Sequence, residues 1–213
     1  MRIIEEFKRD KECGGTFWNT FDRKLKHTLI SHRYELLSIK RYYKAGHVLN
    51  VGAGRDCGKL GDNVVSLDFR MGEDHYTKGH RWGAVYPDIV CDMHSIPRAD
   101  NEFDTVMAMH VFEHTDKPKK LLREFFRVVR PGGYIALILP CGAGNPYWNY
   151  VRDKTHEYMW TRYDFKGWLV RQGFVEPKNI KGENLSNTGV IVQYGKMKTW
   201  MNKWSFDCVI RKN

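Results

Sequence analysis

Residues that could hold a nucleoside follow three short apolar segments of the chain. Gly52-Ala53-Gly54 follows the first segment, and glycines there allow a tight turn and a close approach of the backbone to a ligand. Asp68 follows the second segment, where a carboxylate can accept hydrogen bonds from both ribose hydroxyls. Asp92 follows the third and can accept from an exocyclic amine such as that of adenine, with Met93 against the ring. Each signal alone is common, but their ordered series predicts a nucleoside site.

Candidate proton acceptors follow a fourth apolar segment and a fifth one. His110, Glu113 and His114 come directly after the fourth, whereas Asp153 and His156 come after the fifth. Histidine suits this role because its unperturbed pKa of about 6.5 lies close to neutrality. We predict His156 as the preferred base, with His114 and Glu113 as the other catalytic candidates. His114 could equally bond the backbone at a helix entry, and Glu113 could equally be structural.

The elements that must position these residues alternate between strands and helices. The strand segments are short and rich in β-branched and apolar residues, and they lie at residues 47–54, 63–69, 87–93, 103–110, 133–140 and 206–212. Helices are predicted from a cap at Thr115 or Asp116 to Pro131, and from Thr161 to Gly173. This alternation predicts an α/β three-layer sandwich with a Rossmann-like, mostly parallel sheet, whose ligands bind at the carboxyl ends of the strands.

The first 46 residues are predicted to be a helical extension of a domain spanning residues 47–213. Apolar and aromatic residues recur there at three- and four-residue steps, which indicates an amphipathic helix; they are Trp18, Phe21, Leu25, Leu29, His32, Leu36, Ile39 and Tyr43. We expect this helix to pack on the core. It could also act as a lid over the site.

Composition limits the class of protein. The net charge of +10, from 35 Lys and Arg against 25 Asp and Glu, fits either a solvated basic surface or a nucleic-acid partner, and we favour the first. The five cysteines form no C-x-x-C pair, so we expect reduced thiols, no metal site and a cytoplasmic protein. The N-terminus has no signal-peptide core, and no apolar run approaches the roughly 18 residues of a membrane span.

The successive motifs resemble those of class I S-adenosylmethionine (SAM)-dependent methyltransferases of the type 11 kind. The similarity is carried by HVLNVGAG, by SLDFR, and by the stretch from Asp88 to Pro140. The resemblance implies a seven-stranded sheet with an antiparallel last strand, and SAM as the cofactor. It assigns the glycine turn to the methionine part of SAM, the acid after the second strand to the ribose, and the acid after the third strand with its neighbour to the adenine. The predicted cofactor-binding residues are Asn50, Gly52, Ala53, Gly54, Asp68, Phe69, Asp92, Met93 and His110.

The chain departs from that family pattern in three places. Asn50 stands where the first strand often ends in an acid, and Asp56 where a third glycine is common. Only thirteen residues, 55 to 67, separate Gly54 from Asp68, which leaves room for little more than one helical turn. The short link also argues against a dinucleotide site built on Gly52, Gly54 and Gly58, because pyrophosphate binding needs a helix start.

These observations predict an enzyme that transfers a methyl group by in-line displacement to an unidentified small-molecule or glycan-type acceptor. An RNA or nucleic-acid methyltransferase is the first alternative, motivated by the charge. A SAM-binding partner protein without catalysis is the second. The Asn145-Pro146-Tyr147-Trp148 segment is similar to a box of DNA adenine methyltransferases, but that box follows the fourth strand, whereas this segment follows the fifth.

Overall fold

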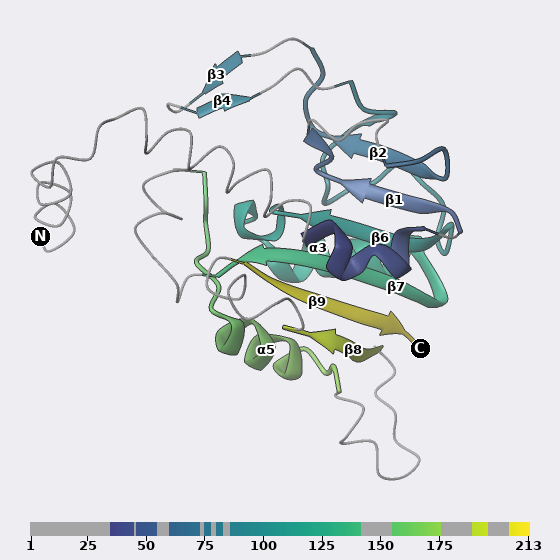
Figure 1. The fold of residues 1–213 in the computed structure, drawn as a ribbon, viewed down its shortest axis with the longest axis vertical. Coiled ribbons are helices and arrows are strands. Elements are labelled where there is room, and N and C mark those ends of the chain that lie inside the picture. Colours follow the sequence, from purple (N-terminus) through teal and green to yellow (C-terminus); the bar gives the residue numbers. More distant parts are fainter. Residues whose placement is uncertain are drawn as a thin grey trace, which may run out of the picture.

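A seven-stranded sheet with the strand order β5-β2-β1-β6-β7-β9-β8 forms the centre of the molecule (Figure 1). The structure is a computed structural model, and it describes residues 35–44, 46–54, 60–72, 75–77, 80–82, 86–141, 155–175, 189–195 and 205–213. A separate two-stranded hairpin joins β3 (His75–Thr77) to β4 (His80–Trp82).

Five strands of the sheet run parallel, and the last strand runs against its neighbours. The parallel strands are β1 (Val48–Val51), β2 (Val64–Asp68), β5 (Ile89–Val90), β6 (Phe103–Met109) and β7 (Val129–Pro140). The final strand, β9 (Ser205–Lys212), is antiparallel to both β7 and β8 (Gly189–Tyr194). The predicted fold class, including the antiparallel last strand, is therefore confirmed.

The strand order reverses at β1, and this reversal fixes where a ligand can bind. The chain proceeds from β1 through β2 to β5 on one side and then returns to β6 on the other side of β1. In open parallel sheets the loops diverge at such a point and leave a crevice beyond the carboxyl ends of the strands. The turn that contains Gly52 and Gly54 lies at the carboxyl end of β1.

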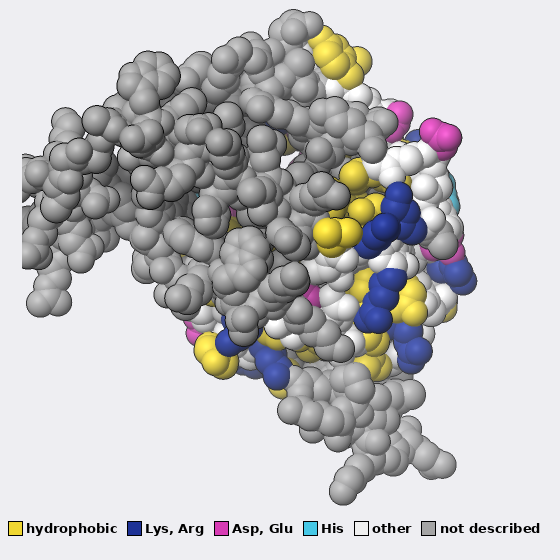
Figure 2. Space-filling view, in the orientation of Figure 1, with side chains coloured by type: hydrophobic (Ala, Val, Ile, Leu, Met, Phe, Trp, Pro, Cys, Tyr) yellow, Lys and Arg dark blue, Asp and Glu magenta, His cyan; other side chains and the backbone are white. Residues whose placement is uncertain are grey.

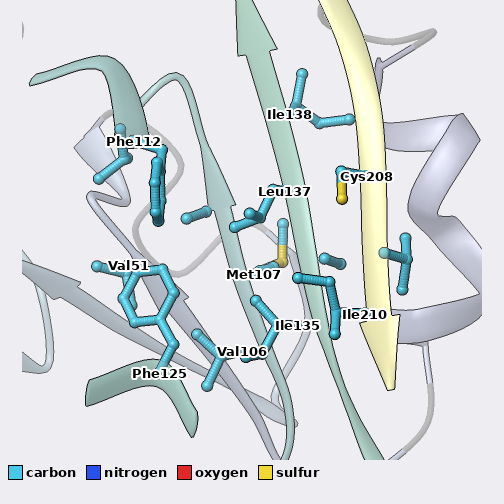
Figure 3. Close-up of a cluster of buried hydrophobic side chains, with 14 of the residues drawn as sticks. Val51, Val106, Met107, Phe112, Phe125, Ile135, Leu137, Ile138, Cys208 and Ile210 are labelled. Atoms are coloured by element: carbon cyan, nitrogen blue, oxygen red, sulfur yellow. The ribbon is translucent and has the colours of Figure 1, made fainter. Parts of the chain in front are cut away.

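Helices cover both faces of the sheet. Residues 35–43 form a helix on the face of Thr105, whose hydroxyl donates to the backbone oxygen of Tyr42 at 2.7 Å. Successive strand residues point to opposite faces, so Val106 faces the other side, where it lies beside Phe125 of helix α3 (Pro118–Val128) (Figure 3). The three-layer arrangement follows from this alternation.

The short 3-10 helix η2 (Phe112–His114) is anchored in the core by its first residue. Phe112 is fully buried, with ring centroids 6.4 Å from Phe125 and 5.5 Å from Phe165 of helix α5 (Arg162–Arg171) (Figure 3). Its neighbours in η2, Glu113 and His114, are thereby held at a fixed place next to the end of β6.

The structure confirms one predicted helix start and corrects another. The Thr161 side chain accepts from the backbone N–H of Asp164 at 3.0 Å, as expected for a capping box. At α3 the cap is Lys117, not Thr115 or Asp116, because the Thr115 hydroxyl oxygen instead accepts from the Lys117 N–H at 2.9 Å. That helix also ends earlier than predicted, since Val129 already belongs to β7.

The described part of the N-terminal extension is helical and packed on the core, as predicted. Ile39 is fully buried, and Gln193 of β8 donates to the backbone oxygen of Ser38 at 3.0 Å. The earlier part of the predicted helix lies outside the described residues, and the domain boundary at residue 46 stays a prediction. Among the described residues, no helix combines the length and apolar character needed to cross a membrane.

Three cysteines can be compared with the expectation of reduced thiols. Cys91, Cys141 and Cys208 are free, and Cys208 is buried in the core (Figure 3). Burial raises the pKa of the Cys208 thiol, so it stays protonated. Cys13 and Cys57 lie outside the described residues.

Candidate functional site

The glycine turn after β1 and the acid after β2 are joined by a direct hydrogen bond. The backbone N–H of Gly54 donates to Oδ2 of Asp68 at 3.0 Å, and the Ala53 N–H donates to the Leu67 backbone oxygen at 3.0 Å. Oδ1 of Asp68 accepts from the backbone N–H of Arg70 at 3.2 Å. Two residues fourteen positions apart in sequence are thus held in one small site, as their strand-end positions predict.

Both positions of the turn require glycine, and Gly52 requires it for a second reason as well. Gly52 and Gly54 have φ angles of +65° and +50°, a region that other residues rarely adopt. A Cβ at Gly52 would also lie 2.3 Å from Cγ2 of Val111, whereas a Cβ at Gly54 would meet no atom of the described residues within 4 Å. The turn therefore packs against the segment after β6 at Gly52, whereas no described residue crowds the side-chain position of Gly54.

Asp92, the acid that follows β5, is held by a histidine that sequence reasoning missed. Oδ1 of Asp92 accepts from the backbone N–H of His94 at 2.9 Å and lies 2.7 Å from its Nδ1. These contacts keep the pKa of Asp92 below its usual value. On its other side, Nε2 of His94 lies 2.6 Å from the Thr115 hydroxyl oxygen. The D-x-H spacing was the only sequence signal for this role.

The remaining predicted cofactor residues differ in exposure. Asn50 is buried within β1, and Met93 is half-buried beside Asp92. Phe69 follows Asp68 and is 70% exposed, with the Arg70 guanidinium 5.4 Å from the centre of its ring. Phe69 is therefore open to a flat partner.

His110 directly follows β6 in a strained backbone conformation and is held by the N-terminal helix. Its φ is +53°, and its Nε2 lies 3.1 Å from Oε2 of Glu35. Burial disfavours the charged imidazole, but the carboxylates of Glu35 and Glu113 outweigh that effect and raise the pKa of His110 to about 9. Glu35 also accepts a hydrogen bond from the Ser205 hydroxyl. Sequence reasoning missed Glu35, although it precedes Ile39 at the four-residue spacing of core positions.

The structure brings the three predicted catalytic residues together. Oε1 of Glu113 lies 3.8 Å from Nε2 of His114, 3.9 Å from Nε2 of His156 and 3.8 Å from Nδ1 of His110. The Glu113 side chain is only 1% exposed, and the rings of His114 and His156 meet edge to face at 4.7 Å. A buried carboxylate therefore faces several imidazoles, an arrangement that can hold a proton or a cation. Their catalytic roles stay predictions.

The loop that carries His156 is fixed to η2 by its backbone. The Glu113 backbone oxygen accepts from the N–H groups of Glu157 and Tyr158 at 2.8 and 3.1 Å. Nδ1 of His114 lies 2.8 Å from the Thr155 hydroxyl oxygen. These contacts explain how His156, distant in sequence, reaches Glu113.

Aromatic residues that flank His156 in the sequence are candidates to stack on a flat acceptor, and those that the structure describes take two different positions. Trp160 is buried and packs on Phe165 with ring centroids 5.1 Å apart, so it serves the core. Tyr158 stacks on Trp160 at 5.0 Å and remains partly exposed. The other candidates, Tyr147, Trp148 and Tyr150, lie outside the described residues, as do Asp153 and the Asn145–Trp148 box.

Comparison with known proteins agrees with this geometry. A family described as "Methyltransferase domain", of the type 11 kind, matches residues 49–137, which include the glycine turn, Asp68, Asp92 and η2. Residues 49–137 are thus similar to the methyltransferase domain family, as the motifs predicted. The dinucleotide interpretation is thereby set aside.

Curated relatives match the methyltransferase domain over less than half of their own length. A demethylmenaquinone methyltransferase of Renibacterium salmoninarum is 36% identical over 98 residues, which are 42% of this chain and 39% of the relative. An uncharacterized methyltransferase of Mycobacteroides abscessus is 33% identical over 91 residues, 43% of this chain and 34% of the relative.

Solved structures share the methyltransferase fold at low sequence identity. A methyltransferase of Haloferax volcanii, in complex with the Trm112 activator, has a TM-score of 0.58 and 12% identity, covering 89% of this chain and 94% of the other. A SAM-dependent methyltransferase of Archaeoglobus fulgidus has a TM-score of 0.54 and 17% identity, covering 92% and 100%.

Proposed function

We propose that this protein transfers the methyl group of SAM to a small-molecule or glycan-type acceptor. The observation that carries the proposal is the Gly54–Asp68 hydrogen bond, which joins the glycine turn to the predicted ribose acceptor where the strand order reverses. No described residue lies within 4 Å of a Cβ placed at Gly54, which supports a close approach of a ligand to that turn. SAM fits these residues because its ribose needs hydrogen-bond acceptors and its methionine part needs backbone access.

The expected contacts of SAM follow the order of the strands. The turn at residues 52–54, with Asn50 beneath it, would hold the methionine part. Asp68 would accept from the ribose hydroxyls, and the exposed ring of Phe69 lies beside it. Asp92 and Met93 would hold the adenine. His110 would lie near the methionine end, because Val111 next to it packs on Gly52.

Methyl transfer depends chiefly on alignment of the acceptor with the sulfonium methyl carbon. Holding two reactants close together in the reactive orientation lowers the activation free energy by up to about 7–11 kcal/mol. When the acceptor bears a proton, a nearby base contributes typically about 100- to 10,000-fold in rate. Glu113, His114 and His156 would assist removal of that proton.

Relatives favour a small acceptor over a macromolecule. The Renibacterium relative is named for demethylmenaquinone, and a relative from Botryococcus braunii, 24% identical over 120 residues, is named a sterol methyltransferase-like protein. Both names denote small, largely apolar molecules. Among the described residues, Tyr158 and Met159 next to the cluster are exposed and offer such a molecule an apolar contact.

A nucleic-acid acceptor remains the second candidate because of the net charge of +10. In the coloured part of the face shown in Figure 2, Lys and Arg side chains lie among hydrophobic ones. A SAM-binding protein without catalysis is the third, and the cytoplasm is the compartment that the free cysteines favour.

Calorimetry with SAM tests the proposal. We expect Asp68→Ala to weaken SAM binding by at least about 10-fold, because the carboxylate both orders the turn and receives the ribose. Asp62→Ala, an exposed aspartate in the turn before β2, should bind SAM normally. Thermal melts would establish that both variants are folded. Absence of SAM binding by the wild-type chain, or normal affinity in folded Asp68→Ala, would overturn the proposal.

A further inference from the structure

The buried cluster at η2 combines the donor atoms of a transition-metal site. Among the described residues, Glu113, His114 and His156 each offer one ligand atom, and these atoms all lie within 4.8 Å of one another. Two imidazole nitrogens and one carboxylate oxygen suit zinc and similar divalent ions, whereas magnesium and calcium prefer oxygen ligands alone. We propose that Glu113, His114 and His156 bind a divalent metal ion of the zinc class beside the methyl-transfer site.

The distances fit an ion after small side-chain movements. Zinc lies about 2.0–2.2 Å from such ligands, so two ligands of a tetrahedral site are about 3.3–3.5 Å apart. Oε1 of Glu113 now lies 3.8 Å from Nε2 of His114 and 3.9 Å from Nε2 of His156. A contraction of about half an ångström at these two distances, together with a closer approach of the two imidazoles, whose ligand atoms lie within 4.8 Å of each other, would complete three ligand bonds.

The surroundings hold His114 in the orientation that metal binding needs. Metal-ligating histidines usually donate their other ring N–H to an oxygen, which leaves the facing nitrogen unprotonated for the ion. Nδ1 of His114 lies 2.8 Å from the Thr155 hydroxyl oxygen and 3.3 Å from the Thr155 carbonyl oxygen, and a carbonyl can only accept. This contact directs a lone pair on Nε2 toward Glu113.

The backbone fixes the spacing of the ligands. Glu157 and Tyr158, which follow His156, donate to the Glu113 backbone oxygen, while Phe112 anchors η2 in the core. The ligands therefore come from two segments that the fold holds in register, and not from a mobile surface group. No metal site was expected from the sequence, because its cysteines form no C-x-x-C pair. The proposed ligands instead combine a carboxylate with two histidines that are distant in sequence.

Three protein ligands leave at least one position on the ion for another molecule, which is the pattern of catalytic zinc sites. This role rests on the proposed methyl transfer. A hydroxyl oxygen of the acceptor would bind the ion and lose its proton to water more readily. The oxygen would then form the new bond to the methyl carbon, the sulfur–methyl bond would break, and its electron pair would stay on sulfur. The acceptor class thus narrows to molecules that carry a hydroxyl group.

Zinc titration of the full chain, stripped of metal with a chelator, tests the site. We expect one Zn²⁺ per chain, measured by competition with a chromophoric chelator, and a tetrahedral visible spectrum when Co²⁺ replaces it. His156→Ala and the near-isosteric Glu113→Gln should each weaken binding by at least about 10-fold. His47→Ala removes an exposed histidine at the start of β1 and should leave the affinity unchanged. Circular dichroism would confirm that each variant is folded.

Two results would overturn the metal site. One is a wild-type chain that binds no zinc, and the other is an equal loss of zinc in His47→Ala and His156→Ala, which would indicate scattered surface binding. SAM calorimetry on the same samples separates this inference from the proposed function. If the chain binds SAM but no zinc, only the proposed metal site is refuted. If it binds zinc but no SAM, the proposed methyl transfer is refuted and the metal site is retained.

Discussion

Oε2 of Glu35 lies 3.1 Å from Nε2 of His110, so the helix that precedes the domain core holds the residue that directly follows β6. Glu35 is 4% exposed and also accepts from the Ser205 hydroxyl at the start of β9. The three residues connect the N-terminal helix with two strands of the sheet. The predicted extension is therefore part of the structure that supports the site, and its docking fixes the strained backbone of His110.

Glu35→Ala should destabilise the protein because it leaves His110 and Ser205 without this carboxylate. Removing one partner of a buried ion pair costs about 3–5 kcal/mol, and the partial exposure of His110 lowers the expected loss to about 1–3 kcal/mol. Urea denaturation would measure it. Glu157→Ala, at an exposed glutamate, is the matched control and should change the free energy of unfolding by less than about 0.5 kcal/mol. Equal effects of the two variants would contradict the role assigned to Glu35.

Gly52→Ala and Gly54→Ala should separate the backbone conformation of the turn from its packing. Both residues have positive φ, so each alanine costs about 1–2 kcal/mol of left-handed strain. Only Gly52→Ala also places a Cβ 2.3 Å from Val111, which adds about 1–3 kcal/mol of overpacking. Thermal and urea unfolding should therefore rank Gly52→Ala as the less stable variant.

Shortening the Val111 side chain should relieve the clash that an alanine at position 52 creates. Gly52→Ala combined with Val111→Ala should recover part of the loss, so that the double variant is more stable than the sum of the two single changes predicts. The same Val111→Ala change combined with Gly54→Ala should be additive, because a Cβ at Gly54 would meet no atom of the described residues within 4 Å. Additivity in both pairs would mean that Val111 does not constrain Gly52.

Ser66→Ala tests the pH dependence of the contact between β2 and the start of β5. Oδ2 of Asp88 accepts from the Ser66 hydroxyl at 2.6 Å and from the Ser66 N–H at 2.7 Å, and these bonds lower the pKa of Asp88. A lowered carboxylate pKa stabilises the fold above the unfolded pKa of about 3.9, and this stability is lost as the pH falls through the folded value. Ser66→Ala should therefore cost about 1–2 kcal/mol at pH 7 and less at about pH 3.

Asp88→Asn provides the control for this pH dependence. The amide keeps the shape of the side chain but carries no titratable group, so Ser66→Ala in the Asp88→Asn background should cost the same at both pH values. Urea denaturation at the two pH values measures all four proteins. A pH-dependent difference that survives in the Asp88→Asn background would assign the titration to another group.

The sheet could be predicted where the strands carry continuous apolar runs. Such runs occur in the strands β1, β2, β6 and β7, because both faces of each of these strands are covered by helices. β8 was missed because its single short run, GVIVQY, cannot be distinguished from a buried helical turn by periodicity alone. The start of β7 was also missed, since Pro131 and two glycines predict a helix end and a turn, yet Val129 already pairs with Phe103.

The candidate site could be located from sequence but its contacts could not. Strand ends place Gly54, Asp68 and Asp92 at one edge, because parallel strands present their carboxyl ends together. Glu35 and His94 were not predicted, since each acts through another residue and lies on a helix face or a loop whose docking only the fold determines.

His94→Ala should weaken SAM binding less than Asp92→Ala does. The alanine removes the ring contact to Oδ1 of Asp92 but keeps the backbone N–H of residue 94, which is the larger cause of the lowered pKa of Asp92. We expect a loss in SAM affinity of up to about 10-fold, as for other residues that orient a binding group. Calorimetry would measure it with His47→Ala as the control, and unchanged affinity in His94→Ala would remove His94 from the site.

Salt dependence should distinguish a small acceptor from a nucleic acid. A protein that contacts 6–10 phosphates loses about 10³–10⁵ in affinity between 50 and 200 mM salt, because neutralised phosphates release counterions. A small uncharged acceptor involves no such release, so its methylation rate should change by less than about twofold over that range. The measurement follows labelled methyl groups from SAM into pools of metabolites, glycans and RNA at both salt concentrations. Label in the RNA pool that disappears at high salt would replace the small acceptor with a nucleic acid, and the charge of +10 would then be its binding surface.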